Sequence, residues 1–143
     1  MKSNIWLITF LLISTLGSKV YATNFVDHNS KEGLEIIAEM LNQQAPITYL
    51  NGITLVNVKS GDKRLRWLLK LDDTNIQELS EKDVQEWLMY YQSGIISNTC
   101  NDKAMIENVI SQGTEFVYVI IDSGHERLMH FLVNNSTCST FSK

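Results

Sequence analysis

The sequence has few of the residues, and none of the short motifs, by which catalytic and cofactor sites are usually recognised. It contains one proline, two cysteines and three histidines among 143 residues. It has no glycine-rich phosphate loop, no HExxH or GxSxG motif and no CxxC pair. We therefore expect a protein that is not an enzyme, with no catalytic residues, no cofactor and no metal site.

The first 22 residues have the pattern of a secretory signal peptide. Lys2 precedes an apolar run from Ile5 to Leu16, and the small-residue site Val20-Tyr21-Ala22 follows it. The run is shorter than the roughly 20 apolar residues of a spanning helix, so an uncleaved anchor is the weaker alternative. The sequence predicts cleavage after Ala22 and a single exported domain over residues 23–143.

The predicted exported part is acidic. Removal of Lys2 and Lys19 from the 12 lysines and arginines leaves 10 against 16 aspartates and glutamates, a net charge of about −6. An acidic surface disfavours nucleic acid and anionic membranes. We expect a protein partner and no nucleic-acid partner.

Both cysteines, Cys100 and Cys138, lie in the exported part. Because exported proteins meet oxidising conditions, an even count favours one disulfide over two free thiols. Neither cysteine stands at the predicted new N-terminus, where a bacterial lipoprotein carries its acylated cysteine. The sequence therefore predicts a soluble exported protein without a lipid anchor.

An amphipathic helix is predicted over residues 30–44, with Asn29 and Glu32 as a capping box and Pro46 after its end. Its apolar positions recur at helical spacing: Leu34, Ile37, Ala38 and Leu41. This stripe indicates a core face, and a partner-binding surface is the alternative.

Residues 47–58 alternate with a period of two, which predicts β-structure. Within them, Asn51-Gly52 is compatible with a hairpin turn or with a bulge in one long strand. We favour the bulge, because the stronger turn signal, Ser60-Gly61-Asp62, follows. A strand over 63–71 comes next, with Leu65, Trp67, Leu69 and Leu71 on one face.

The opposite face of that strand carries Arg64, Arg66 and Lys70. A basic strip at strand spacing could bind an acidic peptide. A solvated sheet face is the simpler interpretation.

Two further helices are predicted after a polar connector over 72–79. Ser80 and Asp83 form a capping box for a helix over 81–97, which would bury Val84, Trp87, Leu88, Tyr91 and Ile95. Asn101 and Asp102 would cap a short third helix, which Gly113 ends as a left-handed residue.

The last part is predicted to be a hairpin, with strands over 115–121 and 126–133 joined by a turn at 122–125. The predicted order is α-β-β-α-α-β-β. We expect an α+β fold in which the N-terminal helix and two central helices cover one face of a four-stranded antiparallel sheet.

The three histidines, His28, His125 and His130, share no metal-ligand spacing. His125 in the turn and His130 on the last strand are candidates for pH sensing near neutrality. Ordinary turn and strand positions are the alternative.

Several segments, taken together, resemble the periplasmic domain of the AspS/YghG-type pilotins of type II secretion. The resemblance covers the chain from about Glu32 to Cys138. It is carried by Ala45-Pro46-Ile47, Gly52-Ile53-Thr54-Leu55-Val56, Ser60-Gly61, Trp87-Leu88, Tyr91-Gln92, Cys100-Asn101-Asp102, Met105-Ile106, Gln112-Gly113-Thr114-Glu115-Phe116 and Ser136-Thr137-Cys138.

This resemblance implies a disulfide between Cys100 and Cys138. It also implies binding of a short helical segment at the C-terminus of a secretin, in a groove beside the helix that carries Leu34, Ile37 and Leu41. Pilotins of that type carry a lipidated cysteine that this sequence does not have. The resemblance therefore implies partner binding without transport on a lipid of the protein's own.

The sequence thus predicts a non-enzymatic protein of the Gram-negative periplasm that binds and stabilises a component of a secretion or pilus apparatus. A first alternative is a partner of a membrane-bound transcription regulator of virulence or fimbrial genes. There, the His125 and His130 hairpin or an apolar pocket would sense pH or a bile-like ligand. A second alternative is an immunity or inhibitor protein, whose acidity would suit a basic toxin.

Overall fold

The computed structural model describes residues 27–72 and 78–141, so the predicted signal peptide, its cleavage site and most of the 72–79 connector lie outside it. Four helices, one π-helical turn and five strands follow one another in this part of the chain. They are α2 (Lys31–Gln44), β1 (Ile47–Leu50), β2 (Ile53–Gly61), β3 (Arg64–Leu71), α3 (Glu81–Asn101), α4 (Lys103–Met105), η2 (Ile106–Ile110), β4 (Glu115–Ile121), β5 (Arg127–Val133) and α5 (Asn135–Phe141). None of these helices is long and apolar enough to cross a bilayer.

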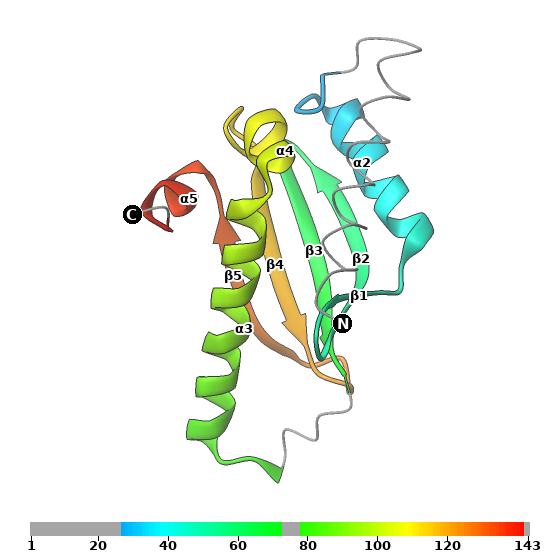
Figure 1. The fold of residues 1–143 in the computed structure, drawn as a ribbon. Helices are drawn as coiled ribbons and strands as arrows, with labels where there is room; N and C mark the ends of the chain where they lie inside the picture. Colours follow the sequence, from blue (N-terminus) through cyan, green and yellow to red (C-terminus); the bar gives the residue numbers. More distant parts are fainter. Residues whose placement is uncertain (1–26, 73–77, 142–143) are drawn as a thin grey trace.

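The five strands form one mixed sheet in the order β1-β2-β3-β4-β5 (Figure 1). Three neighbouring pairs are antiparallel, whereas β3 and β4 run parallel. The α+β class is confirmed, but the prediction of four antiparallel strands was wrong. The chain leaves β3, crosses the sheet through α3 and returns to the same end, and a crossover of this kind makes the next strand parallel.

The fifth strand exists because Asn51-Gly52 is a hairpin turn, so the preference for a bulge in one long strand was wrong. Gly52 has φ 83°, and the Tyr91 hydroxyl donates to the Asn51 carbonyl at 3.4 Å. A Cβ at residue 52 would lie 2.6 Å from the Tyr91 oxygen. Only glycine satisfies both the positive φ and this close approach.

Helix α2 starts at Lys31, and its N-cap is Ser30 rather than the predicted Asn29. The Ser30 hydroxyl accepts a hydrogen bond from the Gly33 amide at 3.0 Å. Asn29 instead donates to the Asn108 carbonyl at 2.8 Å and accepts from the Thr114 hydroxyl at 2.9 Å. Asn29 thus ties the start of α2 to the segment that precedes β4.

One hydrophobic core lies between the sheet and the helices. The predicted alternation in β3 is confirmed, since Leu65, Trp67, Leu69 and Leu71 are buried. The four apolar residues of the α2 stripe belong to the same core cluster, as do residues of α3, η2, β2 and β4. Helices α2 and α3 therefore cover the same face of the sheet, with α2 packed against β2 and α3 against β5 (Figure 1).

Helix α3 is longer than predicted and ends at Asn101. The predicted N-cap Ser80 is confirmed, because its hydroxyl accepts from the Asp83 amide at 3.2 Å. The Asp83 carboxylate accepts from this hydroxyl at 2.6 Å, instead of from the Ser80 amide as in a capping box. Asp102 then caps the short helix α4, which continues into η2. Gly113, with φ 97°, follows it as the predicted left-handed residue.

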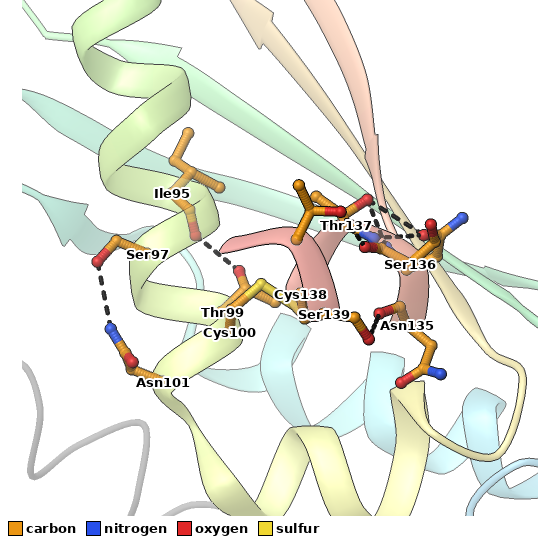
Figure 2. The surroundings of a disulfide bond; sticks show 12 residues. Ile95, Ser97, Thr99, Cys100, Asn101, Asn135, Ser136, Thr137, Cys138 and Ser139 are labelled. Carbon is orange, nitrogen blue, oxygen red and sulfur yellow. Dashed lines mark hydrogen bonds between the residues drawn. A yellow bond between two sulfur atoms is a disulfide. The ribbon is translucent and has the colours of Figure 1, made fainter. Parts of the chain in front are cut away.

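A disulfide joins Cys100 of α3 to Cys138 of α5, as predicted (Figure 2). Their Cα atoms lie 5.1 Å apart. Helix α5 was not predicted, because its sequence lacks apolar periodicity. It is held by the disulfide and by Asn134, whose side-chain oxygen accepts from the Thr137 amide at 3.0 Å.

Loss of this cross-link is expected to destabilise the fold strongly. The cysteines are 38 residues apart, and a closed loop of this size contributes about 4 kcal/mol in the chain-entropy model. We expect C100S/C138S to lower the free energy of unfolding by about 2 to 4 kcal/mol, measured by denaturant titration. The exposed variant S139A serves as the control. An unchanged midpoint in C100S/C138S would contradict this assignment.

Candidate functional site

A pocket of about 250 Å³ lies between the C-terminal end of α3, helix α4 and the core face of the sheet. Its floor consists of four aromatic side chains from three strands, which we call the aromatic floor: Tyr49, Trp67, Phe116 and Tyr118. Its rim consists of polar residues from α3 and α4, with Met105 beside them. The pocket therefore has an apolar base and a polar mouth.

The aromatic floor follows from strand register. Trp67 of β3 is the direct partner of Tyr118 of β4, and their stacked rings lie 5.7 Å apart. Phe116 lies two residues from Tyr118 on the same face, and its ring is 5.4 Å from Trp67. Tyr49 of β1 is tilted against Trp67 at 6.1 Å. Side chains that are distant in sequence thus form one continuous aromatic surface.

Three hydroxyl groups next to the floor form a directed hydrogen-bond chain. The Thr99 hydroxyl donates to the Ile95 carbonyl at 2.8 Å (Figure 2). Its hydrogen is therefore used, and Tyr118 must be the donor in the 2.7 Å contact with Thr99. The single hydroxyl hydrogen of Tyr118 is then used as well, so Tyr49 must be the donor in its 3.2 Å contact with Tyr118. Every O–H of this chain has an acceptor.

Burial is the main influence on the acidity of these groups. It raises the pKa of Tyr118 well above its ordinary value, with the neighbouring Tyr49 as a further cause. Burial also raises the pKa of Tyr49, although its hydrogen bonds to Tyr118 and Thr99 oppose the change. Both phenols therefore stay protonated at neutral pH.

The floor contains one unsatisfied donor. Trp67 is 2 % exposed, and its Nε1 has no hydrogen-bond acceptor within the described part of the chain. A buried donor without an acceptor costs about 1 to 3 kcal/mol. The indole N–H of Trp67 is therefore an unsatisfied donor within the packed layer of the sheet.

The polar rim consists of Asn98, Asn101, Asp102 and Lys103. Asp102 accepts a hydrogen bond from the Met105 amide at 3.1 Å, which caps α4. Burial raises the pKa of the Asp102 carboxyl, although bonds from backbone amides act in the opposite direction. The rim thus combines amides, a lysine and a partly desolvated carboxylate.

A second feature lies on the N-terminal half of α3, which extends past the sheet (Figure 1). Trp87 is 39 % exposed and Tyr90 is 73 % exposed; their i, i+3 spacing places them on one side of the helix. Each ring contacts the buried Tyr91 edge-on at 5.7 Å. We call Trp87 and Tyr90 the α3 aromatic patch. The prediction that Trp87 is buried was wrong, because the buried side of this half of the helix is formed by Leu88 and Tyr91.

The predicted partner contacts of α2 do not lie at a groove. Leu34, Ile37 and Leu41 are 0 %, 6 % and 6 % exposed. They face the sheet, where α2 packs against β2. In this structure these three side chains belong to the core.

The two candidate pH-sensing histidines lie on one hairpin but at different positions. His125 is exposed in the β4–β5 turn with φ 68°. His130 is exposed on β5, opposite Val119. The described chain contains no group of three or more side chains suited to hold a metal ion. Both histidines are thus exposed on one hairpin, and pH sensing stays a prediction.

The predicted basic strip is only partly free. Arg64 pairs with Glu115 of the neighbouring strand at 2.8 Å, whereas Arg66 is exposed and Lys70 is half-buried. An acidic peptide would have to compete with Glu115 for Arg64. The strip is better explained as the solvated face of the sheet.

No protein-family model matches this chain, and no curated protein sequence matches it. Solved structures do. A pilotin of the type 2 secretion system of Vibrio vulnificus, EpsS, matches with TM-score 0.58 and 19 % identity, over 76 % of this chain and 94 % of the pilotin. The type II secretion pilotin AspS from Vibrio cholerae matches with TM-score 0.53 and 15 % identity, over 76 % of this chain and 94 % of that pilotin.

A third match is a protein from Pseudomonas aeruginosa that is described as secreted. It has TM-score 0.62 and 11 % identity, over 81 % of this chain and 98 % of that protein. The chain thus has a pilotin-like fold, as the sequence resemblance predicted. At sequence identities of 11 % to 19 %, the similarity to these structures establishes the fold alone.

Removal of the central hydroxyl of the chain is expected to destabilise the protein. Y118F leaves Tyr49 without its acceptor and Thr99 without its donor. We expect a loss of about 1 to 3 kcal/mol in the free energy of unfolding, measured by urea titration. The matched control is Y90F, at a hydroxyl on the 73 % exposed Tyr90. Equal stabilities of the two variants would show that the hydroxyl chain contributes nothing.

Asp102 is expected to make stability depend on pH. Because its pKa is raised in the folded state, the folded protein binds this proton more tightly than the unfolded chain. The free energy of unfolding therefore falls as the pH rises from the ordinary aspartate pKa of about 3.9 through the raised pKa of Asp102.

D102N keeps an oxygen for the Met105 amide but carries no charge. We expect thermal unfolding of D102N at a higher temperature than wild type at pH 7, and at the same temperature at pH 3. The control is D62N in the exposed β2–β3 turn. A lower midpoint of D102N at pH 7 would show that the charge stabilises α4.

Proposed function

We propose that this protein is a non-enzymatic accessory protein of the Gram-negative periplasm that binds and stabilises a component of a secretion apparatus, with a secretin subunit as its partner. The observation that carries the proposal is the pilotin-like fold, which spans 94 % of both matched pilotins. The matched proteins are described as pilotins of type II secretion systems. A fold shared over nearly their whole length supports a related role here.

The mode of action that we propose differs from transport on a lipid. Both cysteines of the sequence are joined in the Cys100–Cys138 disulfide, so neither is available for acylation. The protein would therefore hold and protect its partner in the periplasm rather than carry it on a lipid of its own.

The α3 aromatic patch is the surface that we propose for the contact. Exposed tryptophan and tyrosine side chains are typical of the residues that contribute most to protein interfaces. Trp87 and Tyr90 are already ordered by their contacts with Tyr91, so little side-chain entropy would be lost on binding. The patch would receive the apolar side of an amphipathic helix.

The charges around the α3 aromatic patch indicate which residues we expect on the polar side of the partner helix. Glu81, Asp83 and Glu86 lie in the first turns of α3 together with a single lysine, Lys82, which pairs with Glu86 at 3.8 Å. This acidic surface is complementary to basic residues that flank the apolar side of a partner helix.

The proposal is tested by crosslinking and capture from the bacterial envelope, followed by identification of the bound chain. Wild type is expected to recover the secretin, and W87A/Y90A to recover at least tenfold less, since hot-spot residues contribute 2 kcal/mol or more. L132A is the matched control, because Leu132 of β5 is 40 % exposed, like Trp87 at 39 %.

Two outcomes would overturn the proposal. Recovery of a membrane regulator or a toxin instead of the secretin would favour one of the alternative functions. Full recovery of the secretin by W87A/Y90A would show that the contact lies away from the α3 aromatic patch.

A further inference from the structure

We propose that the outer face of the sheet, the side turned away from the helices, binds an anionic phospholipid bilayer. The contact is made by four cations, which we call the basic face: Lys59, Arg66, Lys70 and Arg127. The α3 aromatic patch belongs to the helix layer on the other side of the sheet (Figure 1). A bilayer on the basic face leaves that patch accessible, so the inference stands independently of the secretin contact proposed above.

Strand alternation separates the two faces of the sheet. The core side of β3 carries Leu65, Trp67, Leu69 and Leu71, so the residues between them point to the outer side. Every described helix contributes side chains to the core cluster. Within the part of the chain that the structure describes, the outer face therefore has no helix packed over it.

Strand register places the four cations on this one surface. Lys59 of β2 is the direct partner of Arg66 of β3. Four residues further along β3, Lys70 is paired with Ile121 of β4, and the partner of Ile121 on β5 is Arg127. Because directly opposed residues of neighbouring strands share a face, the basic face extends from β2 to β5.

None of these four cations has an ion pair among the described residues. Arg64, the remaining cation of the outer face, is paired with Glu115 at 2.8 Å. Lys59 and Arg66 lie opposite each other, and like charges in this arrangement lower stability. An anionic surface would relieve this repulsion.

The spread of the cations favours a planar partner. Neighbouring strands lie about 4.8 Å apart, so about 14 Å separates the strand of Lys59 from the strand of Arg127. A peptide helix, about 10 Å wide, would follow one line across this surface. A bilayer reaches all four cations at once, since long lysine and arginine side chains adapt to the twist of the sheet.

Apolar side chains occupy the centre of the outer face. Leu68 of β3 is half-buried and is paired with Val119 of β4. Val119 and Ile121 are 3 % and 6 % exposed although they lie outside the core cluster. The acidic turn residues Asp62 and Asp122 lie beyond the ends of the strands. A bilayer that lies flat over the middle of the strands therefore meets cations around an apolar centre.

The net negative charge of the protein is a poor guide to this face, because the charges are segregated. The two carboxylates of the outer face are engaged, Glu115 with Arg64 and Asp72 with the Thr54 hydroxyl at 2.7 Å. The acidic residues of α2 and α3 lie on the far side of the sheet, about 10 Å further away across the helix. At physiological salt the Debye length is about 8 Å, so a bilayer interacts mainly with the basic face.

The proposal is tested by sedimentation of the protein, purified from the periplasm, with lipid vesicles. We expect binding to vesicles of equal parts phosphatidylglycerol and phosphatidylcholine, and much weaker binding to pure phosphatidylcholine. Binding should weaken as the sodium chloride concentration rises, because salt screens the attraction. Equal binding to the two kinds of vesicle, or no binding to the anionic vesicles at low salt, would overturn the proposal.

The location is tested by removing charges from the basic face. Each basic residue near an anionic bilayer contributes about a fivefold factor in affinity, so K59Q should bind about fivefold and K59Q/R66Q about 25-fold more weakly than wild type. Loss of the like-charge pair is not expected to destabilise the fold. A urea midpoint no lower than that of wild type therefore identifies folded K59Q/R66Q.

The matched control is K31Q, which removes the same charge from the exposed start of α2. K31Q should bind the anionic vesicles like wild type. Equal weakening by K59Q and K31Q would show that net charge alone governs binding and would refute the basic face.

An acidic protein is the other class of partner that cations attract, and poly-L-glutamate is the probe for it. Binding of poly-L-glutamate by a protein that does not bind the anionic vesicles would identify an acidic protein surface as the partner. That result would replace the bilayer in this proposal.

Discussion

The parallel pairing of β3 with β4 is the constraint on which the rest of the structure depends. Two hairpins, β2–β3 and β4–β5, could stand side by side in several ways, but a parallel junction requires the chain to return to its starting end. The return path is α3, which therefore lies across the sheet and fills the half of its face that α2 leaves open (Figure 1). The same junction sets Trp67 beside Tyr118 at the centre of the sheet.

The pocket follows from a mismatch of size between the two layers at this junction. The strands present four large rings, whereas the end of α3 above them presents the short polar side chains of Asn98 and Thr99. Thr99 compensates part of this mismatch by accepting a hydrogen bond from Tyr118, whose buried O–H would otherwise lack an acceptor. The volume that neither layer fills remains as the pocket. Replacement of Thr99 by a leucine would bury more apolar surface but would leave the Tyr118 O–H without an acceptor.

Local patterns in the sequence were sufficient for most of the elements, but not for helix α5, for the separation of β1 from β2 or for the pairing of the strands. The alternation in β3, the Ser80 cap and Gly113 each depend on nearby residues, and each was predicted correctly. Parallel and antiparallel neighbours of β3 bury the same alternate residues, so no periodicity distinguishes them. Asn51-Gly52 was ambiguous because a positive-φ glycine serves a hairpin and a bulge equally well. The pocket could not be predicted, because its floor exists only once the register of β3 with β4 is known.

The exposure of the α3 aromatic patch has a physical origin in how α3 is held. Its C-terminal half is fixed by the disulfide at Cys100 and by Thr99. Its N-terminal half is held by Leu88 and Tyr91, which are buried in the core, and the Tyr91 hydroxyl also bonds to the Asn51 turn. Trp87 and Tyr90 share the ring of Tyr91 as their support and present their other faces to solvent. Because burying either ring against this domain would require moving a helix anchored by a covalent bond, a second molecule is the simplest way to cover them.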